Sequence, residues 1–179
     1  ADFLCSCGAH ISGAGSGEIT VCGMKKLHSA EHTVIPDRII ASTYMAAAAV
    51  TGGDVRILDT RAEHITPVIP VFEQAGCKVD CGENSVHILA PVRLRSVQTV
   101  RTMPYPGFPT DSQAAVMAML SVAHGTSVMI ENIFENRYRH VRELCRLGAD
   151  IMTEGKVAVI KGSRAGSNTL FCYFTETVI

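Results

Sequence analysis

The sequence repeats itself with a period of about 70 residues, and this repeat limits the possible folds more than any other feature. A short pattern around a glycine occurs three times, as CGAHI, AGCKV and LGADI. Its glycines, Gly8, Gly76 and Gly148, lie 68 and 72 residues apart. A second set of landmarks keeps the same period: Pro36 lines up with Pro109, and Gly53 with Gly125. A fixed period of this length indicates that one supersecondary unit is used repeatedly.

Each unit predicts a helix, a strand, a second helix and a strand pair, in that order. Ala-rich helices are expected at 38–50 and 112–124, each ending at a glycine and followed by a β-branched strand. These strands are expected at 54–58 and 126–131. Apolar side chains at helical spacing over 138–145 predict an amphipathic helix that Gly148 stops. The strand pairs are expected at 10–11 with 18–22, at 78–80 with 85–89, and at 150–152 with 156–161.

The Ala-rich helices predict where the core lies. Almost no face of MAAAAV or AAVMAMLSVA is charged, and a helix that is apolar all round is normally buried. Small side chains also let such helices approach each other closely. We therefore expect an α/β fold in which each unit places one helix inside and one outside, covered by strands.

Composition excludes several classes of partner. The chain has 179 residues, of which 47% are hydrophobic and 18% charged, as in a globular domain with one sizeable core. Its net charge of −1, without a basic stripe, argues against nucleic acid and anionic lipid as partners. No apolar run approaches the roughly 20 residues that span a bilayer. We expect a cytoplasmic protein that does not contact the membrane.

The cysteines and histidines predict neither disulfides nor a metal site. Seven cysteines are spread through helical and strand segments, which is unlike a disulfide framework and indicates reduced thiols. The pairs Cys5 with Cys7 and Cys77 with Cys81 lack the CxxC spacing of zinc ligands. The segment HSAEH at 28–32 is not an HExxH motif and reads as a polar linker. We expect no metal and no cofactor.

One polar constellation stands at the start of the second Ala-rich helix. The segment RTMPYPGFPTDSQA contains three prolines and a glycine that fix the loop before Asp111. Either Thr110 or Asp111 caps the helix, as the aligned Asp37 would, or Asp111 is a base beside an anion-attracting helix start. The two roles can coexist. Arg101 before the loop and Arg137 after the next strand would lie near Asp111 if both strand ends converge, or else be solvated.

The same segments carry a family resemblance. RTMPYPGFPTDSQA, IFENRYRHVRELCRLGADI and VIPDRI resemble the UDP-N-acetylglucosamine 1-carboxyvinyltransferase family of enolpyruvyl transferases, over about residues 1–163. FPTD and FENR distinguish this family from 3-phosphoshikimate 1-carboxyvinyltransferase, which shares the fold and chemistry and is the alternative. A non-catalytic nucleotide-sugar-binding or remnant module is a further alternative.

The resemblance implies a fold and a domain plan. The fold is an inside-out α/β barrel, in which each of two domains is built from three such units with buried helices. On this plan residues 1–23 end the first, catalytic-loop domain, residues 24–163 form two of the three repeats of the second domain, and residues 164–179 are an atypical tail. The N-terminal domain and the third repeat are therefore expected to be missing, and the barrel to be incomplete.

The resemblance also implies an activity. Family members transfer the enolpyruvyl group of phosphoenolpyruvate to the 3-hydroxyl of UDP-N-acetylglucosamine, the first committed step of peptidoglycan synthesis, which links them to cell shape and cell division. Asp111 would be the catalytic base or orient the hydroxyl, and would bind the sugar. Ile133 would contact UDP-N-acetylglucosamine through its backbone, and Arg137 would supply positive charge. Arg101 belongs to the same predicted substrate-binding set.

The departures from the family pattern matter equally. The family's Lys-Asn pair and its mobile loop, with the Cys or Asp that acts as acid at phosphoenolpyruvate, match no segment of this chain. Cys5, Cys7 and Cys22 align with the end of the first domain and are not assigned that role. The chain is therefore expected to be inactive alone.

Overall fold

A computed structural model describes residues 1–162, which form two compact units, one of them Ala1–Ile35 and the other beginning at Pro36. The first unit contains the short helix α1 (Asp2–Ser6) and an antiparallel pair of strands, β1 (His10–Ser12) and β2 (Thr20–Cys22). The predicted strand pair is therefore confirmed. The backbone N–H of His28 donates to the Cys7 carbonyl at 3.0 Å, which ties the HSAEH segment to the end of α1.

The first repeat of the second unit forms a three-stranded antiparallel sheet in the order β3-β5-β4. Its strands are β3 (Asp54–Leu58), β4 (Lys78–Cys81) and β5 (Ser85–Leu89), and its inner helix is α2 (Arg38–Thr51). The outer helix is split into α3 (Ala62–Ile65) and α4 (Ile69–Gln74). Pro67 fits the split, because it has no N–H to continue the hydrogen bonds of α3, while Pro70 fits the first turn of α4.

The second repeat forms a four-stranded sheet in the order β6-β7-β9-β8, in which only β6 and β7 are parallel. Its strands are β6 (Thr99–Arg101), β7 (Gly125–Ile130), β8 (Asp150–Glu154) and β9 (Val157–Gly162). A 3-10 turn, η1 (Thr110–Ser112), leads into the inner helix α5 (Gln113–Ser121), and the outer helix is α6 (Arg139–Arg146). All the predicted strands of this repeat are present. Its inner helix is shorter than predicted at its carboxyl end.

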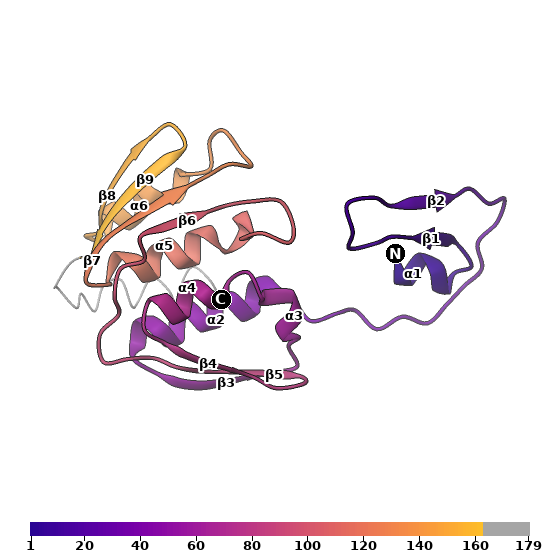
Figure 1. Cartoon of the computed structure of the whole chain (residues 1–179), viewed down its shortest axis with the longest axis horizontal. Coiled ribbons are helices and arrows are strands. Elements are labelled where there is room, and N and C mark those ends of the chain that lie inside the picture. Colours follow the sequence, from indigo (N-terminus) through magenta and orange to yellow (C-terminus); the bar gives the residue numbers. More distant parts are fainter. Residues whose placement is uncertain (163–179) are drawn as a thin grey trace. The chain divides into compact units, whose positions relative to one another are not determined.

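The two inner helices form the core of the second unit. In Figure 1, α2 and α5 lie side by side between the two sheets, α2 against β3 and β5 and α5 against β9. Met45 and Ala46 on α2 and Met117 and Met119 on α5 are fully buried. The predicted inside position of the Ala-rich helices is therefore confirmed. Within residues 1–162 the sheets do not close into a barrel, and no helix in that range is long and apolar enough to cross a membrane.

A buried hydrogen bond also joins the inner helices. The hydroxyl oxygens of Ser42 on α2 and Ser112 at the start of α5 lie 3.0 Å apart, and both side chains are inaccessible to solvent. A buried hydroxyl without a partner is costly. The Ser42 hydroxyl also donates to the Ile39 carbonyl at 3.0 Å, whereas the Ser112 hydroxyl has Ser42 as its partner within the described residues. This pair fixes the position of the start of α5 relative to α2.

The three glycines that define the repeat have the same backbone geometry. Gly8, Gly76 and Gly148 have φ angles of +97°, +102° and +97°, and each follows a helix and precedes the first strand of a pair. This left-handed conformation is one that glycine adopts without a steric cost and other residues avoid. The sequence repeat is therefore a repeat of backbone geometry.

The inner helices begin differently. Asp37 caps α2, since its Oδ1 accepts hydrogen bonds from the N–H groups of Ile39 at 2.7 Å and Ile40 at 3.4 Å. Neither η1 nor α5 has a side-chain cap. The prediction that Thr110 or Asp111 caps the second helix is wrong, because both side chains are bonded to other residues.

We expect Asp37→Ala to lower the free energy of unfolding by about 1 kcal/mol, because it removes the acceptor for two N–H groups at the start of α2. Urea denaturation followed by circular dichroism measures the change. Glu83→Ala, which removes an exposed acidic side chain in the turn between β4 and β5, is the matched control and should change stability by less than about 0.5 kcal/mol. Equal losses in the two variants would contradict the role of Asp37 as a cap.

Candidate functional site

The loop before Asp111 is folded back on itself. The N–H of Met103 donates to the carbonyl of Phe108 at 3.0 Å, and Thr102 and Phe108 form a β-bridge. Gly107 lies so close to the Cβ atom of Met103 that a side chain at this position would clash with it. These contacts fix the conformation of the loop that leads into η1, and Asp111 is the middle residue of that turn.

Asp111 is held by two arginines from different parts of the second unit. Its Oδ1 accepts a hydrogen bond from Nη2 of Arg137 at 3.1 Å, and its Oδ2 accepts one from Nη2 of Arg38 at 3.3 Å. The three side chains are between 37% and 47% exposed. Ion pairs this exposed contribute only about 0–1 kcal/mol each to stability. They matter more for where the carboxylate points than for the stability of the fold.

A buried carboxylate, that of Glu131, organises the surroundings of Asp111. Glu131 directly follows β7, is 1% exposed and accepts five hydrogen bonds. Its Oε1 accepts from the Thr102 hydroxyl and from the N–H groups of Ile133 and Phe134, at 2.7–3.0 Å. Its Oε2 accepts from the Thr110 hydroxyl at 2.9 Å and from Nε2 of Gln113 at 2.6 Å. One side chain thus joins the loop after β6, the start of α5 and the loop after β7.

These hydrogen bonds also decide the charge of Glu131. Burial raises its pKa, but the N–H groups of Phe134 and Ile133 and the hydroxyls of Thr102 and Thr110 lower it by more. The net pKa lies below the ordinary value of 4.5. Glu131 is therefore ionised at neutral pH and can only accept hydrogen bonds.

The contact with Glu131 limits what the backbone of Ile133 can offer a ligand. Its N–H donates to Oε1 of Glu131 at 2.7 Å. The carbonyl oxygen is the remaining polar backbone group of Ile133. The Ile133 side chain is 37% exposed, so this loop lies at the surface.

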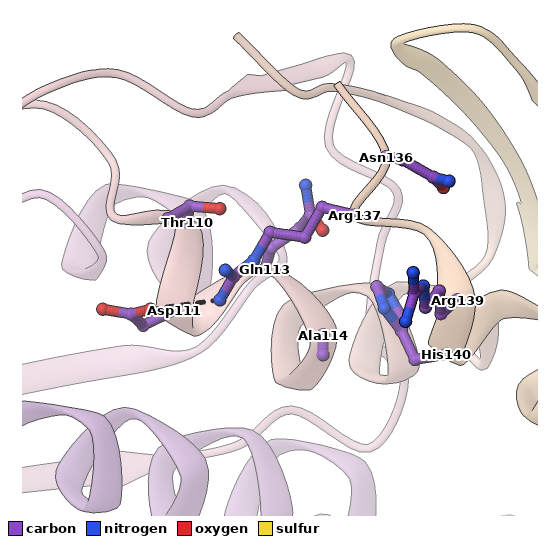
Figure 2. Close-up of a pocket in the computed structure, with 8 residues that line it drawn as sticks. All are labelled: Thr110, Asp111, Gln113, Ala114, Asn136, Arg137, Arg139 and His140. Atoms are coloured by element: carbon purple, nitrogen blue, oxygen red, sulfur yellow. Dashed lines mark hydrogen bonds and ion pairs between the residues drawn. The ribbon is translucent and has the colours of Figure 1, made fainter. Parts of the chain in front are cut away.

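A cavity of about 420 Å³ opens beside Asp111, between the start of α5 and the start of α6. Its lining residues are Thr110, Asp111, Gln113, Ala114, Asn136, Arg137, Arg139 and His140. Figure 2 shows the Arg137 side chain reaching toward Asp111, with Arg139 and His140 on the other side of the view. The Arg137 guanidinium also lies over the ring of Phe134, 5.0 Å from its centroid, which helps to hold its direction.

The structure brings some of the predicted residues together and not others. The predicted proximity of Arg137 to Asp111 is confirmed. The second cation is Arg38, which the sequence did not indicate. Arg101 is exposed at the end of β6 and, in the part of the chain described, neither pairs with Asp111 nor lines the cavity. Its role in binding stays a prediction.

The sequence did not indicate two residues of the candidate site, Arg38 and Glu131, although each carries a weak signal. Arg38 directly follows Asp37, so it stands at the start of the aligned inner helix. Glu131 directly follows β7, as Asp59 directly follows β3 in the first repeat. Comparing the repeats position by position would have drawn attention to both.

Comparison with known proteins finds similarity to enolpyruvyl transferases. The family model for EPSP synthase (3-phosphoshikimate 1-carboxyvinyltransferase) matches residues 1–173. UDP-N-acetylglucosamine 1-carboxyvinyltransferase 2 of Caldanaerobacter subterraneus subsp. tengcongensis is 47% identical over 161 residues, and the enzyme of Geotalea daltonii is 48% identical over 162. Both alignments cover 90% of this chain but 39% of the relative. The chain thus spans about two fifths of the length of these relatives.

Solved structures share the fold at lower identity. The enolpyruvyl transferase NikO from Streptomyces tendae has a TM-score of 0.76 at 21% identity, with 94% of this chain and 43% of that one covered. EPSP synthase from Acinetobacter baumannii has a TM-score of 0.67 at 23% identity, covering 90% and 39%. The predicted enolpyruvyl transferase type of α/β fold is therefore confirmed.

We expect Glu131→Gln to lower the free energy of unfolding by about 2–4 kcal/mol at pH 7, because the new amide group leaves buried donors without an acceptor. The folded pKa of Glu131 is depressed, so its contribution is present above pH 4.5 and is lost as the pH falls through the folded value. The difference between wild type and variant should therefore shrink in acid. Denaturation at pH 7 and at successively lower pH measures it, and a difference independent of pH would contradict the assignment.

Proposed function

The chain belongs to the enolpyruvyl transferase family, and from that premise we propose that it is part of a UDP-N-acetylglucosamine 1-carboxyvinyltransferase and carries the acceptor-sugar part of its active site. The names of relatives at 46–49% identity support this acceptor. On this proposal the complete protein acts in peptidoglycan synthesis in the cytoplasm, and so in cell-wall biogenesis and cell division. Its substrates are UDP-N-acetylglucosamine and phosphoenolpyruvate.

The observation that carries the proposal is the position of Asp111. In the proposed reaction the 3-hydroxyl of the sugar attacks C2 of phosphoenolpyruvate while C3 gains a proton, and the tetrahedral adduct then loses phosphate from C2 and a proton from C3. The hydroxyl must give up its proton to a general base within hydrogen-bond reach, and a carboxylate can serve as that base. Asp111 lies at a cavity and does not cap a helix. Each of its oxygens accepts one hydrogen bond from an arginine and keeps a lone pair for the sugar hydroxyl.

The neighbouring groups would position the sugar. Arg38 and Arg137 fix the carboxylate from two sides, and Arg137 adds positive charge near the anionic substrates. Ile133 would contact the sugar through its carbonyl oxygen, because its N–H is occupied by Glu131. Arg101, exposed at the end of β6, would contribute to binding at the edge of the site.

The proposal gives this chain one part of a larger site. Residues 1–23 would end the first domain of the family and residues 24–163 would form two repeats of the second, while the predicted tail 164–179 lies outside the described residues. The groups that bind and protonate phosphoenolpyruvate in the family have no match in this chain. The chain alone would therefore bind the sugar nucleotide without turning it over.

We expect the chain to bind UDP-N-acetylglucosamine, and Asp111→Asn to weaken this binding about tenfold or more, because a charged hydrogen-bond acceptor is lost. Isothermal titration calorimetry measures the affinity. The same change should alter the free energy of unfolding by less than about 1 kcal/mol, since the ion pairs are half exposed. Glu154→Gln, at the exposed end of β8, is the control for lost negative charge. A large loss of stability with unchanged binding would refute the role of Asp111.

The identity of the acceptor substrate is tested by comparing the affinities of two ligands. Shikimate 3-phosphate should bind more weakly than UDP-N-acetylglucosamine, and the reverse order would favour the 3-phosphoshikimate enzyme. With phosphoenolpyruvate and either acceptor present, a phosphate-release assay should detect no turnover. If neither acceptor binds, the chain is a remnant or a module for another partner.

A further inference from the structure

The cavity beside Asp111 contains two buried polar atoms that nothing in residues 1–162 satisfies. These atoms are Oε1 of Gln113 and Nε2 of His140, and both residues line the cavity. Gln113 is 1% exposed. An unsatisfied buried polar atom costs about 1–3 kcal/mol, and folded proteins contain few of them. Two of them at one cavity point to an occupant.

The orientation of Gln113 follows from the charge of Glu131. Glu131 is ionised, so it can only accept, and the Gln113 amide must present Nε2 to it, as the 2.6 Å contact shows. The opposite orientation would place two oxygens against each other. Oε1 is thus turned away from Glu131 and is a hydrogen-bond acceptor.

The second atom is an acceptor for a similar reason. Burial lowers the pKa of His140, a hydrogen bond to the backbone of Arg137 opposes this shift, and the charge of Arg137 adds to it. The net pKa is below the ordinary value, so the ring is neutral at neutral pH. A hydrogen bond that raises a histidine pKa is one that the ring donates. Because Nε2 has no partner among residues 1–162, the donor is Nδ1, and Nε2 keeps its lone pair.

The other lining groups restrict what can occupy the cavity. Arg137 and Arg139 are permanent cations, and the Asp111 carboxylate offsets one of the two charges. The lining keeps a net positive charge, which disfavours an ammonium group or a metal ion. A fully ionised phosphate or carboxylate would suit the arginines but has no hydrogen to donate to the two acceptors. A neutral group that both donates and accepts satisfies all of these side chains, and hydroxyl and secondary amide groups do so.

We propose that Gln113 and His140 form a hydrogen-bond-accepting subsite for a hydroxyl or amide N–H of the acceptor sugar, next to Asp111. The inference rests on the proposed function, since the sugar that Asp111 contacts is the ligand that brings such groups to this cavity. Gln113 links the subsite to Asp111 through the start of α5, and His140 through the segment that carries Arg137. The subsite adds selectivity for a polyhydroxylated ring, because a ligand without the donor leaves two buried acceptors unpaired.

The direct test follows the side-chain nitrogen signals of Gln113 and His140 by NMR in isotope-labelled chain. The methyl glycoside of N-acetylglucosamine, added without any nucleotide, should shift the His140 Nε2 signal and the Gln113 amide signals, while UDP alone should leave them in place. Glycerol at the same concentration is the control for unspecific hydroxyl groups. Unchanged signals with the sugar, or equal shifts with glycerol, would mean that the cavity holds water only and would overturn the proposal.

Substitution gives a second, independent measurement. His140→Phe keeps a ring of similar size but removes Nε2, and should weaken UDP-N-acetylglucosamine binding about fivefold, the value of one hydrogen bond, without changing UDP binding. His124→Phe, an exposed histidine beyond the far end of α5, is the control. An equal loss of affinity for UDP-N-acetylglucosamine and for UDP, or no loss of affinity for either, would count against the subsite.

Two further measurements distinguish a failure of the subsite from a failure of the proposed function. If His140→Phe does not fold, as judged by thermal unfolding, Gln113→Met removes the other acceptor and should give the same selective loss. If the wild-type chain fails to bind UDP-N-acetylglucosamine, the proposed function is refuted, and the titration with the methyl glycoside still decides the subsite.

Discussion

The ionised carboxylate of Glu131 is the constraint on which the site depends. It is buried, so each of its five hydrogen bonds is made in place of one to water. Those bonds hold the loop after β6, the start of α5 and the loop after β7 in one arrangement. Through them Glu131 determines which way Gln113 faces, which backbone group Ile133 can offer, and where the turn containing Asp111 lies. Glu131 itself need not touch a ligand to have these effects.

Much of the fold could be predicted, because its signals are local. The apolar runs from Arg38 and from Gln113 are visible in the sequence. The glycines that precede the strand pairs indicate where each outer helix ends and a strand pair begins. The exception is the outer helix of the first repeat, which Pro67 breaks in two. Much less of the site could be predicted. Arg38 and Asp111 are 73 residues apart, and no local pattern states which arginine will reach a given carboxylate.

The wrong prediction for Asp111 has an instructive physical cause. Asp37 and Asp111 both stand near the start of an inner helix, and aspartate is a favoured cap at either place. Asp37 caps its helix, whereas Asp111 lies within a 3-10 turn and is bonded to two arginines. The start of α5 is instead held by Ser42 and by Glu131, which contact Ser112, Thr110 and Gln113. Because these other residues hold the start of α5, the Asp111 carboxylate can bond the two arginines and line the cavity.

The contact between Arg38 and Asp111 joins the first repeat to the second. The arginine comes from one copy of the unit and the carboxylate from the other, so neither copy holds the pair by itself. The contact therefore depends on how α2 packs against α5, and a shift between the two repeats would separate the arginine from the carboxylate.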